Sequence, residues 1–372
     1  MQVGIKKLKR FFDVYVPIEN CNLRCDFCYI TQRRLFKNKK VSFKYSAQHI
    51  GKALSQERLG GICHFNLCGG GETLIPKEIV GIIRAILEQG HFIMVVTNGT
   101  MFNRFDEFIE FPAELKDRVG FKLSFHYLEF KRLDIMQKWF DNVNRVRNAG
   151  MSISVEITPT DELIPHIDDI KKVCLENVGA LCHVTVARDN TKPYELPIMT
   201  KLSREEYEKT WGDDFDTPMN HFKMQTFNVK RNEFCYAGAW SGYINIGSGS
   251  MTQCYASYYS QNIFEKIEKP IEFLPVGHNC SVPHCYNSHA FLTLGLIPEM
   301  VTPSYSQIRD REIQDTKFAY THWLTDSMRK FLSGRLVNEN VLLSEEEKRN
   351  ANKKNRKLKI RNIFRRIFRK KI

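Results

Sequence analysis

The stretch CNLRCDFCY at residues 21–29 places three cysteines, Cys21, Cys25 and Cys28, in a C-x3-C-x2-C spacing. It follows a short apolar run, so we expect a loop at the end of a strand. Such a loop can turn three thiolates toward one iron–sulfur cube, and without a fourth ligand nearby one iron stays open to a reactant. A structural zinc site is the alternative. Such sites are closed by four ligands, however, and no further pair of Cys or His follows before residue 58.

Short runs rich in Val, Ile and Phe alternate with amphipathic segments in the first half of the chain. The runs suit buried strands, and Gly90 and Gly150 stand where helices would end. The predicted strands cover residues 11–17, 61–68, 92–97, 120–125, 151–157 and 183–187, and the predicted helices cover 45–59, 77–89, 104–115, 132–149 and 164–176. Six strands with intervening helices predict a parallel α/β sheet, either doubly wound or curved toward a barrel, with its ligand at the C-terminal strand ends.

Functional side chains follow the predicted strands at that edge. CGGGETLIP after the second strand brings three glycines, which let a ligand approach the backbone, and the carboxylate of Glu72, which suits a cationic group. A common strand-to-helix turn is the alternative. The other candidates are Asn98 after the third strand, Ser124, His126 and Tyr127 after the fourth, Glu156 in the fifth, and Arg188 and Asp189 after the sixth.

Taken in order, these residues resemble the radical S-adenosylmethionine (radical SAM) superfamily over roughly residues 10–190. The cysteine spacing, the aromatic Phe27 before the last cysteine, and the turn from Gly70 to Thr73 carry the resemblance. It implies a partial (βα)6 barrel in which the three cysteines hold a 4Fe-4S cluster, with the amino and carboxylate groups of SAM on the open iron. Cleavage of SAM then gives a 5'-deoxyadenosyl radical, which abstracts hydrogen from a substrate.

The resemblance also assigns residues to SAM. Gly70, Gly71 and Glu72 would hold the methionine amino group, Phe27 and Tyr29 would lie by the adenine, and Ser124 would meet the ribose. Asn98 joins them as a polar turn residue that binds the cofactor or caps the connection. Thr73 stands where the family usually has proline, so we expect a less firmly fixed turn there.

Five residues are candidates for the base that deprotonates a substrate radical: His126, Tyr127, Glu156, Arg188 and Asp189. Each has a structural alternative. The histidine can have a satisfied structural role, the buried glutamate must be paired or face a cleft, and Arg188 and Asp189 can form a salt bridge with each other.

A second set of four cysteines, Cys235, Cys254, Cys280 and Cys285, lies in the second half of the chain. Residues 242–247 and 250–257 read as a hairpin that brings the first two together. A closed zinc site is the alternative. The C-x13-G-x4-C spacing is similar to the C-terminal extensions called SPASM and twitch domains, and four cysteines imply the shorter twitch-like form with a second, auxiliary 4Fe-4S cluster. His278, His284 and His289 are alternative ligands for the last pair.

The other cysteines and the connecting segments carry simpler expectations. Cys63, Cys68, Cys174 and Cys182 are expected to be ordinary buried thiols. A capping box from Ser203 to Glu206 opens a helix, and FDTPMNHF at 215–222 is expected to form a loop over the site. The predicted domains are the barrel at 1–200, a linker and helix at 201–232, the twitch-like domain at 233–300, a helical segment at 301–343 and a basic tail at 344–372.

Most of the net charge of +13 belongs to that tail, because residues 345–372 hold thirteen Lys or Arg against three Glu. Ile360, Ile363, Phe364, Ile367 and Phe368 recur at helical spacing among the basic residues, which predicts a basic amphipathic helix. Such a helix suits an anionic membrane surface. A solvated tail and a nonspecific nucleic-acid arm are the alternatives; a specific nucleic-acid partner is not expected. The sequence shows neither a signal peptide nor a spanning segment, which predicts a cytoplasmic protein. The basic tail adds the expectation of a peripheral position at the inner face of the membrane.

The leading functional hypothesis is a radical SAM oxidoreductase that dehydrogenates a cell-envelope sugar or glycan precursor. The resemblance implies an external electron donor such as flavodoxin or ferredoxin. A peptide or protein maturase is the second hypothesis, weakened by the short segment before the first strand, which leaves no room for a peptide-binding wing. A non-catalytic iron–sulfur or zinc binding module is the third.

We predict that the full-length protein co-sediments with liposomes that contain anionic lipid, because each basic residue near the surface contributes about 1 kcal/mol. A version ending at Leu343 is expected to stay in solution. If both versions stay in solution, the tail does not bind membranes.

Overall fold

The computed structural model describes residues 7–37, 41–192, 195–213, 215, 217–255, 257, 259–278 and 280–369, with side chains as far as residue 362. Within these residues the strands form one nine-stranded sheet in the order β6-β5-β4-β3-β2-β1-β7-β8-β9. The strands are β1 Arg10–Val16, β2 Cys63–Gly69, β3 Phe92–Thr97, β4 Val119–Ser124, β5 Ser152–Ile157, β6 His183–Val184, β7 Ser241–Asn245, β8 Ser250–Thr252 and β9 Ser260–Asn262. Strands β1 to β6 are parallel and joined by helices, as the sequence predicts.

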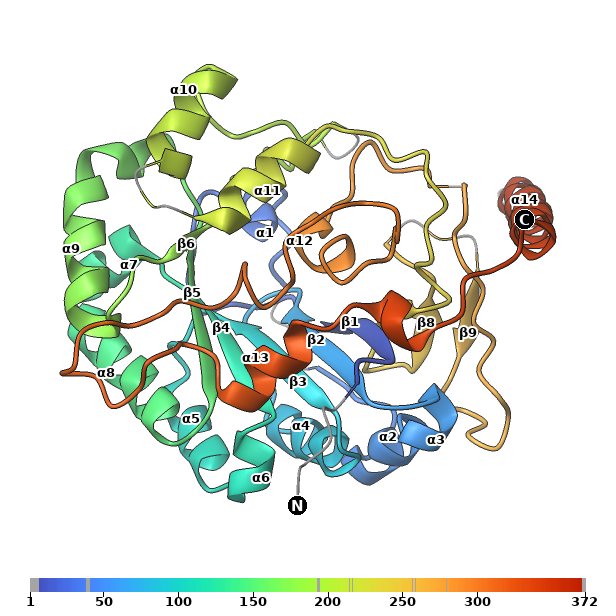
Figure 1. Cartoon of the computed structure of the whole chain (residues 1–372), viewed down its shortest axis with the longest axis horizontal. Helices are drawn as coiled ribbons and strands as arrows, with labels where there is room; N and C mark the ends of the chain where they lie inside the picture. Colours follow the sequence, from blue (N-terminus) through green and yellow to red (C-terminus); the bar gives the residue numbers. More distant parts are fainter. Residues whose placement is uncertain are drawn as a thin grey trace.

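The helices between these strands cover the outer face of the sheet (Figure 1). They are α1 Tyr29–Gln32, α2 Ala47–Ala53, α3 Gln56–Leu59, α4 Ile79–Glu88, α5 Phe102–Ile109, α6 Ala113–Lys116, α7 Tyr127–Arg132, α8 Met136–Asn148 and α9 Ile167–Val178, the last preceded by a 3-10 turn at Asp161–His166. The predicted helices at 45–59 and 104–115 are each divided in two. Gly90 and Gly150 adopt positive φ just after α4 and α8, which confirms both helix ends.

Much of the inner face of the sheet carries polar side chains, beside apolar ones such as Phe11 and Phe92, because side chains alternate along each strand. On β1, Phe12 stacks on Phe65 in the outer core, whereas Asp13 points inward. The same alternation gives the inner face a set of polar residues from the neighbouring strands: His64, Asn66 and Cys68 on β2, Lys122 and Ser124 on β4, and Ser152, Ser154 and Glu156 on β5. This face needs a polar partner or a ligand to cover it.

Residues 301–343 cross this inner face and close it (orange to red in Figure 1). The buried guanidinium of Arg309 forms an ion pair with Glu156 of β5. Trp323 is fully buried and donates its indole N–H to the carbonyl of Val178, at 2.9 Å. Further along, Phe331 of α13 (Asp326–Leu332) stacks on Phe92 of β3, with ring centroids 3.9 Å apart. The segment predicted as helical is instead mostly irregular, with α13 and a 3-10 turn at Leu336–Glu339 as its helical parts.

The cysteine-rich region continues the same sheet. Strand β7 pairs in parallel with β1, and β7 and β8 form the predicted hairpin around Gly249. The capping box at Ser203 is confirmed; it opens α10 (Arg204–Glu208), which runs into a π-helical turn at Lys209–Asp213. The predicted loop at 215–222 is wrong in part. Pro218 starts helix α11 (Pro218–Thr226), because proline fits the first turn of a helix, where its missing N–H costs nothing. The short α12 (Ser288–Phe291) follows the last cysteine pair.

Helix α14 (Glu345–Arg369) lies at the far side from α5 and α6 (Figure 1). Its first half is docked rather than free. Asn355 is buried, accepts a hydrogen bond from Gln253 and donates one to the carbonyl of Pro275, and Lys354 forms an ion pair with Glu272. Ile360 is exposed. The predicted apolar positions Ile363, Phe364, Ile367 and Phe368 lie outside the residues whose side chains are described. Among the described residues, no helix is long and apolar enough to cross a membrane.

We predict that Trp323→Ala lowers the free energy of unfolding by about 3–5 kcal/mol, because it removes a fully buried ring and its hydrogen bond. Urea denaturation measures the change. Val341→Ala is the control, since Val341 is 88% exposed and should shift stability by no more than about 0.5 kcal/mol. Equal effects of the two substitutions would mean that the C-terminal segment does not hold the barrel closed.

Candidate active site

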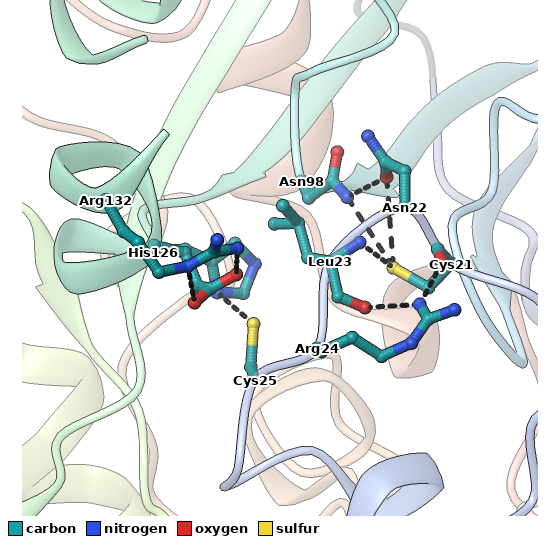
Figure 2. Close-up of polar contacts among 9 residues, drawn as sticks. Cys21, Asn22, Leu23, Arg24, Cys25, Asn98, His126 and Arg132 are labelled. Atoms are coloured by element: carbon teal, nitrogen blue, oxygen red, sulfur yellow. Dashed lines mark hydrogen bonds and ion pairs between the residues drawn. The ribbon is translucent and has the colours of Figure 1, made fainter. Parts of the chain in front are cut away.

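The cysteine loop leaves the C-terminal end of β1 and faces the ends of β3 and β4. Figure 2 shows Cys25 directed at His126, which follows β4; its Sγ lies 3.4 Å from the Nδ1 of His126. Cys21 accepts a hydrogen bond from the side-chain amide of Asn98 at 3.7 Å. Cys28 occupies the N-cap position of the short helix α1, and its thiol makes no capping hydrogen bond. The three sulfurs therefore stand on one loop, at the strand ends where the sequence predicts the site.

The three cysteines line one cavity of about 260 Å³. All of the residues predicted at the SAM site line the same cavity: Phe27, Tyr29, Gly70, Gly71, Glu72, Thr73, Asn98 and Ser124. His126 and Arg188 also line it. Residues from the ends of β1, β2, β3, β4 and β6 thus surround one space, as expected for a ligand site of a parallel sheet.

The carboxylate of Glu72 ties two of these loops together. It is buried, and it accepts hydrogen bonds from the Thr97 hydroxyl at 2.6 Å, the Asn98 backbone N–H at 2.8 Å and the Leu74 N–H at 2.9 Å. Burial raises the pKa of Glu72, whereas these donors stabilise its charged form. Glu72 therefore holds the glycine turn against the end of β3.

The glycines let this turn pack against the cysteine loop. A Cβ on Gly71 would lie 1.9 Å from the carbonyl oxygen of Asn20, and one on Gly70 would lie 2.5 Å from that of Ile18. The phenol of Tyr29 donates to the Gly70 carbonyl at 2.8 Å. The glycines are thus required by the contact between two loops as well as by the shape of the cavity.

The turn that ends at Thr73 is more firmly fixed than the sequence predicts. The turn was expected to be less fixed with threonine in place of proline, but the Thr73 hydroxyl accepts a hydrogen bond from the Gly69 N–H at 2.8 Å. This bond closes the turn from within and proline cannot make it. The substitution therefore replaces one constraint with another.

The thiols of the loop lie close enough to influence each other. Burial raises the pKa of Cys25, and the nearby Cys28 and Cys21 raise it further. Burial also raises the pKa of Cys21. Buried thiols that disfavour each other's ionisation suit a metal, which ligates the thiolate form. The cavity, its three thiols and its glycine turn therefore fit a cluster with SAM beside it.

The candidate bases occupy different places. His126 is buried neutral, because burial lowers its pKa to about 4, and it stacks on Phe27 with ring centroids 5.7 Å apart. Arg188 lines the first cavity and donates to the Tyr286 carbonyl at 3.4 Å. Asp189 instead accepts from Thr191, so the salt bridge considered for this pair is not formed.

Two other candidates lie apart from the first cavity. Tyr127 donates to Asp169 and, with Asp189, lines an outer cavity of about 740 Å³ that shares Cys25, Phe27 and His126 with the first. Glu156 faces the barrel interior, and the pairing expected for it is confirmed by Arg309. Burial opposes ionisation of Glu156, but Arg309 and the nearby Lys122 hold its pKa below the usual range.

The second set of cysteines converges on a small closed cavity of about 40 Å³. Cys235, Cys254, Cys280 and Cys285 all line it, with apolar side chains around them. Burial raises the pKa of Cys254, and Cys285, Cys235 and Cys280 raise it further, so the four thiols are mutual neighbours. Among the described residues, the lining includes none of the alternative ligands His278, His284 and His289. Four thiols around one apolar cavity fit an auxiliary cluster.

No group of three or more His, Cys, Asp or Glu among the described residues is arranged tightly enough to hold a single metal ion. Support for the second cluster therefore comes from the shared cavity and the mutual effect of the four thiols.

One layer of side chains separates the two cavities. Tyr255 and Tyr286 line the second cavity, whereas Cys68 and Arg188 line the first. Tyr286 accepts from Arg188, and the Tyr255 phenol donates to Asp13 of β1. The linings of the two cavities are therefore in direct contact through Arg188 and Tyr286.

Several residues at the site were missed by sequence reasoning. Cys68 was expected to be an ordinary buried thiol, yet it lines the first cavity; Cys63, Cys174 and Cys182 are buried as expected. Lys122, Lys223 and Arg309 face the barrel interior. The signal for Lys122 and Cys68 was present, because polar residues alternate with apolar ones along β2 and β4. Nothing local indicates Lys223 or Arg309, which come from distant segments.

Comparison with known proteins supports the cofactor site. The family model of the radical SAM superfamily matches residues 15–169. The 7-carboxy-7-deazaguanine synthase of Aquifex aeolicus (strain VF5) is 26% identical over 97 residues, or 24% of this chain and 37% of that protein. The chain thus spans well under half the length of this curated relative.

Solved structures with a similar course include SuiB of Streptococcus suis bound to S-adenosylmethionine, at 16% identity and a TM-score of 0.49, covering 90% of this chain and 74% of that one. Another is anSMEcpe with bound AdoMet, at 18% identity and a TM-score of 0.49, covering 69% and 78%.

Residues 15–169, which hold the cysteine loop and the glycine turn, match the radical SAM superfamily. Radical SAM domains bind a 4Fe-4S cluster and SAM, which confirms these two cofactors as predicted from the sequence.

We predict that Thr73→Val lowers the free energy of unfolding by about 1–3 kcal/mol and weakens SAM binding, because it leaves the Gly69 N–H without its acceptor. Equilibrium dialysis of the anaerobically reconstituted protein measures the affinity. Thr73→Ser keeps the hydroxyl and should bind as the wild type does. Equal affinities for all three proteins would show that this hydrogen bond does not shape the site.

Proposed function

We propose that this protein is a radical SAM oxidoreductase that carries one auxiliary 4Fe-4S cluster and dehydrogenates a small hydroxylated substrate, of the kind found in cell-envelope sugars and glycan precursors. The observation that carries the proposal is the pair of cysteine-lined cavities separated by one side-chain layer. A dehydrogenation releases an electron after hydrogen abstraction, and the second cavity offers an acceptor for it at short range.

The first cavity would hold the two cofactors that start the reaction. Cys21, Cys25 and Cys28 would hold the cluster, while Gly70, Gly71, Glu72 and Asn98 would hold SAM, because these residues line one space. When bound, the reduced cluster and SAM supply a 5'-deoxyadenosyl radical that abstracts a hydrogen atom from the substrate. The protein contributes position and the exclusion of water. Phe27 and Tyr29 add aromatic surface beside the space for the adenine.

The second cavity would hold the auxiliary cluster through Cys235, Cys254, Cys280 and Cys285. Its lining is otherwise mostly apolar, which keeps water from the metal. Arg188 and Tyr286 lie between it and the first cavity. A second cluster beside the reaction space favours oxidation of the substrate over a redox-neutral rearrangement, because it can accept the electron that oxidation releases. An external donor such as flavodoxin or ferredoxin would return the electron that SAM cleavage consumes.

The outer cavity supports a hydroxylated substrate. Threonine hydroxyls and carboxylates make up much of its lining: Thr158, Thr160, Asp161, Glu162, Asp189, Thr191 and Thr200. Such groups donate to and accept from the hydroxyls of a sugar. The cavity meets the first one at Cys25, Phe27 and His126, so a substrate in it would reach the radical.

We predict that the reconstituted wild type holds about eight iron per chain and releases 5'-deoxyadenosine from SAM with dithionite. Cys254→Ala with Cys285→Ala should lower the iron to about four and keep the release, because only the second cavity loses ligands. Cys25→Ala should abolish the release. Iron analysis and chromatography measure both.

Cys63→Ala is the matched control, since Cys63 is buried outside the lining of both cavities. It should keep the iron and the release. Wild-type protein with about four iron and one zinc would contradict the auxiliary cluster. Fully loaded protein that releases no 5'-deoxyadenosine would contradict the enzyme.

A further inference from the structure

Four cationic side chains gather in the barrel interior. Lys122 comes from β4, Arg188 follows β6, Lys223 lies on α11 and Arg309 lies on the C-terminal segment. All four lie close enough to His289 to influence its charge. Burial lowers the pKa of His289, and the positive charges of Lys223, Arg309, Lys122 and Arg188 lower it further. Four positive charges from four separate elements therefore act on one point.

The carboxylates nearby do not balance these charges. Glu156 forms its ion pair with Arg309, and Lys122 and Lys223 also act on it. Asp13, a second carboxylate nearby, accepts hydrogen bonds from the neutral groups Tyr255, Asn66 and Asn287. Burial lowers the pKa of His64, to about 3, and of His183, so neither adds charge. Glu72 also lines the first cavity, and its hydrogen bonds come from neutral donors. Four cations and three carboxylates leave a positive excess.

Among the described residues, Lys122 and Lys223 form no ion pair, and the ion pair of Arg309 uses only part of its guanidinium. Lys122 donates to the Tyr305 phenol at 3.4 Å, and Lys223 donates to the Thr185 hydroxyl at 2.5 Å. The side chain of Arg309 is fully buried, yet its Nε and Nη2 atoms have no hydrogen-bond partner. Buried donors are normally satisfied, and buried like charges are costly. This arrangement is therefore incomplete without an anion.

The cations lie beside the proposed reaction space. Thr185, the partner of Lys223, lines the first cavity together with Arg188, Ser124 and Cys68. The carboxylate of SAM itself has another place, since it is expected on the open iron of the cluster. An anion held by these cations would belong to a second molecule in the same cavity.

We propose that Lys122, Arg188 and Lys223 bind an anionic group of the substrate, a phosphate or a carboxylate, in the barrel interior next to SAM. Arg309 stays paired with Glu156 and turns its free donors to the same anion. The substrate class is then a hydroxylated anion such as a sugar phosphate or a sugar acid. That the anion is a substrate rests on the proposed function, but binding of an anion at this site can be tested without turnover.

The test is a thermal-shift titration of the reconstituted, SAM-loaded protein with sodium phosphate, sodium pyrophosphate or sodium acetate, against sodium chloride at equal ionic strength. We expect saturable stabilisation by at least one of the three anions, with phosphate and acetate telling the two chemistries apart. Lys223→Met should weaken that binding at least tenfold. Lys230→Met, an exposed lysine four residues beyond α11, should leave it unchanged.

Lys223→Met should also raise the melting temperature without anion by about 2–4 °C, because it removes a half-buried charge that Glu156, already paired with Arg309, does not balance. Burial lowers the pKa of Lys223 to about 7, against the opposing effect of Glu156, and Arg188, Arg309 and Lys122 lower it further. The folded protein releases that proton near pH 7, whereas the unfolded chain keeps it to the ordinary lysine pKa. The advantage of Lys223→Met is therefore largest below pH 7 and shrinks as the pH rises toward about 10.

Three results would overturn the anion site. They are wild-type stabilisation no larger than that of chloride, unchanged anion binding in Lys223→Met, and a lower melting temperature of that variant at pH 6. Should Lys223→Met fail to fold, Lys122→Met gives the same comparison. The release of 5'-deoxyadenosine without substrate is the separate readout of the proposed function: its loss contradicts the enzyme, whereas loss of the anion effect alone contradicts only this site.

Discussion

The ion pair between Arg309 and Glu156 is the interaction on which the closed form of the barrel depends. It joins the C-terminal segment to β5 across the polar inner face of the sheet. Breaking a buried pair by removing one partner typically costs about 3–5 kcal/mol, because the other charge stays buried. With the pair in place, residues 301–343 cover the interior, and the two cysteine-lined cavities face each other across a single layer of side chains.

The pleat of the strands explains why the interior is polar. Phe12 and Phe65 point to the outer helices, while Asp13, Lys122 and Glu156 point inward at alternate positions. An inner face of this kind is unstable when bare, so it needs both a cover and a ligand. The cover is the C-terminal segment, and the cavities with their unbalanced cations are the space left for cofactor and substrate.

Sequence alone predicted the parallel sheet and the cysteine loop because both rest on local signals: short apolar runs, and three cysteines within eight residues. The alternation of polar and apolar residues along β2 and β4 also indicates that Cys68 and Lys122 face the barrel interior. The contact of Arg309 with Glu156 was out of reach, since 153 residues separate the partners. The hydrogen bond of Thr73 to Gly69 was also out of reach, because a family pattern gives the usual residue and not what a different side chain can do. The roles of the individual site residues remain predictions.

Electron paramagnetic resonance of the dithionite-reduced, fully reconstituted protein, recorded with and without SAM, tests the central claim most directly. Two cysteine-lined sites of different kinds predict two reduced 4Fe-4S signals: SAM changes the one from the site with an open iron and leaves the other unchanged. A single signal from fully reconstituted protein, or two signals that both ignore SAM, would contradict the account.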